Sequence, residues 1–172
     1  MNSRTRIFVV IAAFIAIPYF INMWQSMKTT RDASVRSDSG DIVQSGDLGI
    51  FLTRVGDCLV LPDEFVDYEG TEEVGVVTVT KGVPCTELHD AEVVGETMTA
   101  DSVFPGESVL IERYEQFCSD EYEAYTGEPY STSPHILLPS VPTLESWNTG
   151  DRKIQCFALN ENLEPLGASI RD

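Results

Sequence analysis

The sequence predicts an α+β fold: a small antiparallel sheet with one main packed helix, disulfide-stapled, behind one N-terminal transmembrane helix. Three observations carry this prediction. β-Branched runs of strand length recur between Gly and Pro residues, and one longer stretch has apolar residues at helical spacing. All four cysteines follow a membrane-length apolar segment, which is typical of a domain exported to an oxidising space.

The N-terminal segment is predicted to be a membrane anchor. Residues 7–24 carry no charged side chain. As a helix such a run rises about 27 Å, close to the thickness of roughly 30 Å of a hydrocarbon core. Tyr19 and Trp24 stand near one end, where interfacial aromatic residues are expected. Because no small-residue cleavage site follows the run, an uncleaved anchor is favoured over a signal peptide.

The predicted organisation has four parts. Residues 1–6 are a cytoplasmic stub, residues 7–24 the anchor, residues 25–46 a flexible tether rich in Ser, Asp and Gly, and residues 47–172 an extracytoplasmic domain. Positive charges on the two sides of the anchor nearly balance, so they do not decide its orientation. The cysteines decide it, because thiols in the cytoplasm would stay reduced. We therefore expect a single-pass cell-membrane protein with a cytoplasmic N-terminus.

Three short runs are predicted as the first strands of the sheet: residues 57–61, 74–80 and 91–97. A long acidic loop, residues 62–73, separates the first two. Residues 107–125 are predicted as the main helix, ending at Gly127. Its apolar stripe consists of Val109, Leu110, Tyr114, Phe117, Cys118, Tyr122 and Tyr125.

The last third of the chain is predicted to be mostly loop with two strands. Residues 128–148 contain four prolines and are expected to hold at most a short extended piece at residues 135–138. A β-strand is predicted at residues 153–159, and a short final strand at residues 166–170.

The charge of the predicted exported part limits its partners. From residue 41 to the C-terminus there are 26 acidic and 6 basic side chains, a net charge of −20. Such a surface repels phosphate backbones, so nucleic acid is excluded as a partner. Basic envelope proteins or a wall polymer are the expected partners, besides the membrane that holds the N-terminal helix. An acid excess that serves solubility alone is the alternative.

The four cysteines allow three pairings. The pairing of Cys58 with Cys85 and of Cys118 with Cys156 is favoured, because it joins each cysteine to a neighbouring one in the sequence and the second bridge would tie the helix to the sheet. Each bridge would stabilise the fold by roughly 3–4 kcal/mol. A metal site is the rival, since Cys85 and His89 stand four residues apart, but the other cysteines have no closely spaced partner. We therefore predict no metal and no cofactor.

The order of these motifs resembles the septum formation domain family of actinobacteria. The resemblance rests on Val-Gly-Asp-Cys-Leu at residues 55–59 and Val-Pro-Cys-Thr-Glu-Leu-His-Asp-Ala-Glu-Val at residues 83–93. It continues with the helical Cys118 and with Trp147 followed by Gly150-Asp-Arg and Cys156, and covers about residues 46–159. It implies an extracytoplasmic domain behind one transmembrane helix, with paired cysteines, and no particular reaction. Leu88 stands where the family is expected to have Pro, so the loop around His89 is expected to differ in shape.

Two groups of residues are candidates for function. His89, Asp90 and Glu92 could form a polar pocket; alternatively, His89 bonds to the backbone of a turn held by a bridge between Cys58 and Cys85. The other group is Trp147, Asp151 and Arg152. It could form an interaction patch, since Trp and Arg are frequent in binding hot spots, or it could be structural, with Trp147 in the core.

Motifs of nucleophilic hydrolases, zinc proteases, phosphate-binding loops and calcium-binding loops are absent from the sequence. The sequence therefore favours a membrane-tethered extracytoplasmic interaction domain of the cell envelope over an enzyme. The resemblance links this domain to septum formation or wall assembly. Two alternatives stay open: an envelope-modifying hydrolase that uses Asp, Glu and His89, and a purely structural subunit of a membrane assembly.

Overall fold

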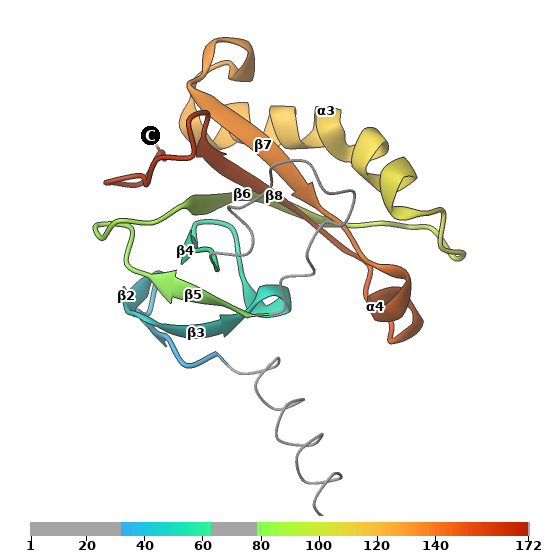
Figure 1. The fold of residues 1–172 in the computed structure, drawn as a ribbon, viewed down its shortest axis with the longest axis horizontal. Helices are drawn as coiled ribbons and strands as arrows, with labels where there is room; N and C mark the ends of the chain where they lie inside the picture. Colours follow the sequence, from blue (N-terminus) through green and yellow to red (C-terminus); the bar gives the residue numbers. More distant parts are fainter. Residues whose placement is uncertain (1–31, 63–78, 172) are drawn as a thin grey trace, which may run out of the picture.

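One six-stranded antiparallel sheet and one long helix dominate the computed structural model, which describes residues 32–62 and 79–171 (Figure 1). The α+β class, the antiparallel pairing and the single main helix are confirmed. The predicted anchor, the cytoplasmic stub and most of the acidic loop lie outside the described residues. Among the residues described, no helix combines the length and the apolar character that a membrane crossing needs.

The order of the strands in the sheet differs from their order in the chain, and every neighbouring pair is antiparallel. From one edge to the other its strands are β3 (Gly46–Gly49), β5 (Val79–Val83), β4 (Cys58–Val60), β6 (Ala91–Met98), β8 (Lys153–Asn160) and β7 (His135–Ser140). The two longest strands, β6 and β8, are neighbours near its centre.

Strand β8 is buried on both faces, and its alternating side chains enter two different cores. Cys156 and Ala158 face the helix, in a cluster with Val94, Cys118 and Tyr122. Phe157 and Leu159 belong to the cluster on the opposite face. This explains why the sequence of β8 is nearly all apolar instead of alternating.

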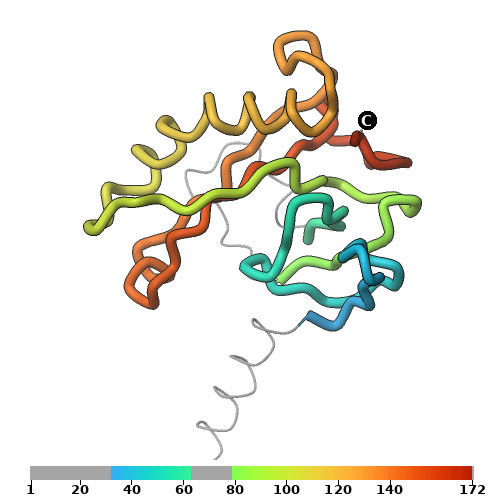
Figure 2. Tube along the Cα trace, turned by 180° about the vertical axis from the view of Figure 1, so that it is seen from behind, coloured from blue at the N-terminus to red at the C-terminus, as the bar shows by residue number. Residues whose placement is uncertain are grey.

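The main helix, α3 (Glu107–Thr126), packs across β6, β8 and β7, as the front and rear views show (Figures 1 and 2). It starts at Glu107, as predicted, and ends where Gly127 adopts the left-handed conformation (φ 71°) and donates its N–H to the Glu123 carbonyl. It lies tightly against Gly95: a β-carbon there would lie 2.6 Å from the Glu121 Cβ. Glycine at this position therefore lets α3 lie directly on β6.

The opposite face holds the second core, around which the sheet curls. Leu48 on β3 and Leu59 on β4 pack with Phe157 on β8, and Leu138 on edge strand β7 lies against the same cluster. Residues from both edge strands therefore reach one core.

A short helix, α4 (Leu144–Asn148), lies in the segment that was predicted to be loop. Thr143 caps it: its side chain accepts the Ser146 N–H, and the Ser146 side chain accepts the Thr143 N–H. Trp147 from α4 packs with Leu110 and Ile154 in a third cluster. The short 3-10 turns Ile50–Leu52 and Tyr130–Thr132 complete the helical elements among the described residues.

The structure differs from the predicted tether in its second half. Strands β1 (Val35–Arg36) and β2 (Ile42–Gln44) pair as a hairpin, and Ile42 is buried. Gly46 allows the chain to pack here, because a β-carbon there would lie 2.4 Å from the Ala33 carbonyl. The polar composition predicted a free linker, but a few anchoring side chains hold residues 32–46 against the domain.

The remaining strand predictions differ at their ends. β6 and β8 agree with the prediction within one residue, whereas the strand predicted at 74–80 is observed as β5, Val79–Val83, with residues 74–78 outside the description. β7 runs on through Pro139, which an edge strand tolerates because one side of it needs no donor. Residues 166–170 form no strand; Leu166 makes only an isolated bridge to His89.

Candidate functional site

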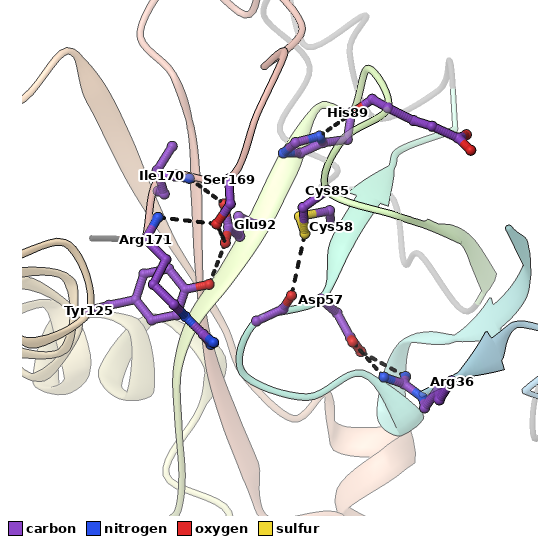
Figure 3. The surroundings of a disulfide bond; sticks show 12 residues. Arg36, Asp57, Cys58, Cys85, His89, Glu92, Tyr125, Ser169, Ile170 and Arg171 are labelled. Carbon is purple, nitrogen blue, oxygen red and sulfur yellow. Dashed lines mark hydrogen bonds and ion pairs between the residues drawn. A yellow bond between two sulfur atoms is a disulfide. The ribbon is translucent and has the colours of Figure 1, made fainter. Parts of the chain in front are cut away.

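A fully buried carboxylate, Glu92 on β6, is the most unusual group in the described part of the chain (Figure 3). It accepts hydrogen bonds from the Tyr125 hydroxyl on α3, from the Ser169 hydroxyl at 2.7 Å and from the Ile170 backbone N–H at 2.8 Å. Three donors are what a buried carboxylate needs in place of water. Glu92 therefore joins the sheet, the last turn of α3 and the C-terminal segment.

Tyr125 and Arg171 complete this cluster. Burial, and next the hydrogen bond to Glu92, raise the pKa of the Tyr125 hydroxyl, so the phenol stays protonated and remains a donor. The Arg171 guanidinium stacks over the Tyr125 ring, 4.6 Å from its centroid. The C-terminal segment is thus held by hydrogen bonds to Glu92 and by a cation–π contact.

The predicted disulfides are both present: Cys58 pairs with Cys85, and Cys118 with Cys156. The second bridge ties α3 to β8, as expected, and all four cysteines of the chain are paired. The sulfurs of Cys58 and Cys85 lie within 4.8 Å of a Glu92 carboxylate oxygen. Since metal binding by cysteine needs thiolates, this group of three is no metal site while the bridge is intact.

His89 bonds to the backbone of a turn, which was one of the two roles predicted for it. The side chain is 1% exposed, and its Nδ1–H donates to the Glu87 carbonyl at 2.8 Å, in the turn next to Cys85. Its backbone pairs in both directions with Leu166. Nε2 is buried and has no hydrogen-bond partner among the described residues.

The structure does not bring His89, Asp90 and Glu92 together in one open pocket. Asp90 accepts the Leu61 backbone N–H at 2.8 Å, while Glu92 bonds to Tyr125, Ser169 and Ile170. The three residues follow one another on one strand end, but each has partners from different segments. They hold three parts of the chain to β6.

A second buried charge lies beside the disulfide, in Asp57 (Figure 3). It receives both terminal nitrogens of Arg36 at 2.6 and 2.9 Å, and the Arg54 backbone N–H at 2.8 Å. The hydrogen bond to Asp57 is the largest cause that raises the pKa of Arg36. This two-pronged ion pair holds the β1–β2 hairpin to the domain.

Trp147, Asp151 and Arg152 also have contacts that serve the fold. Trp147 is 6% exposed and lies 5.3 Å from Phe104, measured between ring centroids. The Arg152 guanidinium stacks 3.5 Å from the centroid of the Trp147 indole and donates to the Trp147 carbonyl at 3.0 Å. Asp151 accepts the Ser146 hydroxyl and the Lys153 N–H. Little of the Trp147 ring remains for a partner.

An open pocket of about 380 Å³ lies at the C-terminal end of α3, and we call it the α3-end pocket. Tyr122 and Thr126 of α3 line it, together with Glu128, Ser133, His135 and Ile170. His135 Nδ1 and the Tyr122 hydroxyl lie 2.8 Å apart in a hydrogen bond. Burial lowers the pKa of His135, although the nearby carboxylates of Glu92 and Glu161 oppose this effect. Ile170 connects the pocket to Glu92, whose carboxylate holds the Ile170 backbone.

The sequence analysis did not predict the contacts of His135 in the α3-end pocket, of Ser169 with Glu92, or of Arg36 with Asp57. Tyr125 was placed on the correct helix face by its spacing, but its polar partner was not predicted. No local signal marks Ser169, whose hydrogen bond joins it to a residue 77 positions earlier.

A comparison with protein families gives one match. The family described as septum formation matches residues 56–156, a region that contains all four cysteines, α3, strands β4 to β7 and the first half of β8. No curated protein and no solved structure matches the chain.

Proposed function

The chain belongs to the septum formation family, and from this premise we propose that it is a membrane-tethered, extracytoplasmic interaction domain of the cell envelope that acts in septum formation. One observation carries the proposal: the family match begins two residues before Cys58 and ends at Cys156, so it spans both disulfides. Disulfides persist in oxidising compartments outside the cytoplasm. The uncharged run at residues 7–24 supports a tether to the membrane.

The role in binding is supported by where the candidate catalytic groups lie. A general acid or base must come within hydrogen-bond reach of the substrate. His89 and Glu92 are buried and bonded within the fold, and neither lines the α3-end pocket. These contacts favour an interaction domain over the hydrolase alternative.

Two measurements test the proposal in growing cells that produce the full-length protein. A fluorescent fusion should concentrate at division septa. An impermeant thiol reagent, applied to intact cells after reduction, should label Cys85, the one cysteine of the four that is not fully buried, because it is expected to lie outside the membrane. Uniform distribution of the fusion would contradict the septal role, and labelling only after lysis would contradict the proposed orientation.

Binding and enzymatic activity are separated by incubating the purified protein with wall fragments and with basic envelope proteins. Saturable, salt-sensitive binding without turnover is expected, since exposed charges are screened beyond roughly 10 Å at 0.1 M salt. Turnover of wall material that is lost in a Glu92→Gln variant would favour the hydrolase. A protein that binds neither material would correspond to a purely structural subunit.

A further inference from the structure

We propose that the α3-end pocket binds the ammonium or guanidinium group of a lysine or arginine side chain from a basic polypeptide. This inference rests on the proposed function and names the chemistry of its partner. The pocket is the part of the described surface where an open cavity, a helix end and an unpaired carboxylate meet.

The walls of the pocket suit a long cationic side chain. Tyr122 and Ile170 give it apolar surface, against which the methylene stem of a lysine or arginine can pack. Glu128 and the hydroxyl of Ser133 stand among its polar groups. The Glu128 carboxylate has no hydrogen bond or ion pair with any described residue, and the residue is exposed. It is therefore free to pair with an incoming cation.

The end of α3 favours positive charge at this place. A helix of this length carries roughly half a negative charge at its C-terminus, and proteins commonly place Lys or Arg there. The last turn of α3 has no basic residue, and it carries Glu123 instead. Glu128 follows the helix and lines the pocket. The carboxylates of Glu92 and Glu161 also lie near enough for their charges to act on His135. Arg171 is the nearby cation, and it is stacked on Tyr125.

His135 adds an acceptor to the pocket. Its burial keeps the ring neutral near neutral pH. When Nδ1–H donates to the Tyr122 hydroxyl, the other ring nitrogen carries a lone pair that can accept an N–H from the ligand. A neutral imidazole does not repel a cation, whereas a protonated one would.

The rest of α3 indicates a polypeptide as the source of the cation. Exposed acidic residues continue along the helix away from the pocket: Glu107, Glu112, Glu115, Asp120 and Glu123. Arg113 is the one basic residue of α3, and it is paired with Asp101. A segment with several basic residues can use both the pocket and this acidic side, and complementary charge speeds its association. A small amine would use the pocket alone.

The test measures peptide binding to the full-length protein in uncharged detergent at low salt. The probe is a fluorescent peptide of alternating glycine and lysine, and its control is the same peptide with every lysine acetylated. Binding of the lysine peptide, followed by anisotropy, should be at least about tenfold tighter than that of the acetylated one. Equal binding of the two peptides would overturn the proposal.

A matched pair of variants separates the pocket from the general acidity. Glu128→Gln should weaken the lysine peptide about three- to tenfold, because it removes the carboxylate of the pocket. Asp47→Asn removes the same charge from an exposed residue of β3, the edge strand opposite to β7, which carries His135, so it should change affinity less than about twofold. Equal losses of affinity in the two variants would mean that only the overall charge of the domain matters, and would overturn the proposal of a binding site in the pocket.

A third variant offers the pocket a cation from within the chain. Thr132→Lys, at an exposed residue of the pocket wall, should lower the affinity for the peptide more than Thr132→Gln does. Wall fragments are tested as competitors beside the unlabelled peptide. If they compete as strongly as the peptide does, the cation belongs to a wall polymer, and the proposal of a polypeptide partner is overturned. Septal enrichment of the fusion protein is measured separately, so a pocket that fails to bind leaves the proposed function intact.

Discussion

The hydroxyl of Tyr125, in the last turn of α3, donates a hydrogen bond to the carboxylate of Glu92 on β6, 33 residues earlier in the chain. The same carboxylate holds the C-terminal segment through Ser169 and Ile170, and it lies next to the Cys58–Cys85 disulfide. One buried acid therefore connects three segments that are distant in sequence: β6, the last turn of α3 and the C-terminal segment. Its contribution should be visible in the stability of the whole domain.

Tyr125→Phe should lower the free energy of unfolding by about 1–3 kcal/mol, because Glu92 stays buried and loses one of its three donors. Urea unfolding measures this change. Tyr114→Phe is the matched control: Tyr114 lies on the same helix, and its hydroxyl has no hydrogen bond with a described residue. The control should change stability by no more than about 0.5 kcal/mol. Equal stability of the two variants would show that the Tyr125–Glu92 bond contributes nothing.

Cys118→Ala should cost about 2–5 kcal/mol under oxidising conditions, since it removes a bridge between α3 and β8. Both Cys118 and Cys156 are fully buried. Glu112→Ala, at an exposed position of the same helix, should stay within about 0.5 kcal/mol. A reducing agent should narrow the difference between wild type and Cys118→Ala. An unchanged melting temperature of the cysteine variant in oxidising buffer would contradict the bridge.

Gly95→Ala should destabilise the domain by about 1–3 kcal/mol, because the new methyl group would push α3 away from β6. The atoms that it meets, Cβ and Cγ of Glu121, lie close to the helix backbone and cannot swing away, at 2.6 and 2.7 Å. Gly167→Ala is the control, since nothing lies within 4 Å of its added β-carbon. Thermal unfolding of the two variants checks this, and similar melting temperatures would disprove the tight packing at Gly95.

Trp147→Ala should lower stability by about 3–5 kcal/mol, because it empties the cluster of Leu110 and Ile154. Leu144→Ala, on the exposed side of α4, should have a much smaller effect. Circular dichroism melts measure both. If Trp147→Ala melts like wild type yet loses a binding partner, then Trp147 belongs to an interaction patch after all.

His135 should make stability depend on pH. Its pKa is lowered from an ordinary value of 6.5, chiefly by burial, so the unfolded chain binds a proton more readily than the folded one. The contribution of neutral His135 to the stability of the fold is complete above the pKa that His135 has in the unfolded chain. It is lost as the pH falls through the pKa that His135 has in the folded protein. The difference in unfolding free energy between wild type and His135→Gln should therefore shrink as pH falls from about 8 to about 5. A difference that is constant with pH would show that the His135 pKa is the same in both states.

Much of the fold was predictable from local sequence. The apolar stripe that ends at Tyr125 and the stop at Gly127 predicted the end of α3 within one residue. The apolar run of β8 and the pairing of Cys118 with Cys156 were likewise predicted. These features depend on a few neighbouring residues or on one element packing against the next.

Other elements were missed because their stability comes from distant contacts. The hairpin of β1 and β2 has a polar sequence, but Arg36 pairs with Asp57 and Ile42 enters the core. α4 is a single capped turn, and Trp147 holds it in place from within the third cluster. Neither case has a long periodic pattern that would mark it.

By itself the sequence determined the α+β class, the main helix, the favoured disulfide pairing and the resemblance to the septum formation family. Only the tertiary structure decided that Glu92 is a buried junction, that His89 serves a turn and that the α3-end pocket is lined by Glu128 and His135. The physical reason is the separation in sequence between the residues that interact. Helix ends and strand periods are encoded within a few residues, whereas the partners of a buried polar group are set by packing between segments that the chain brings together from far apart.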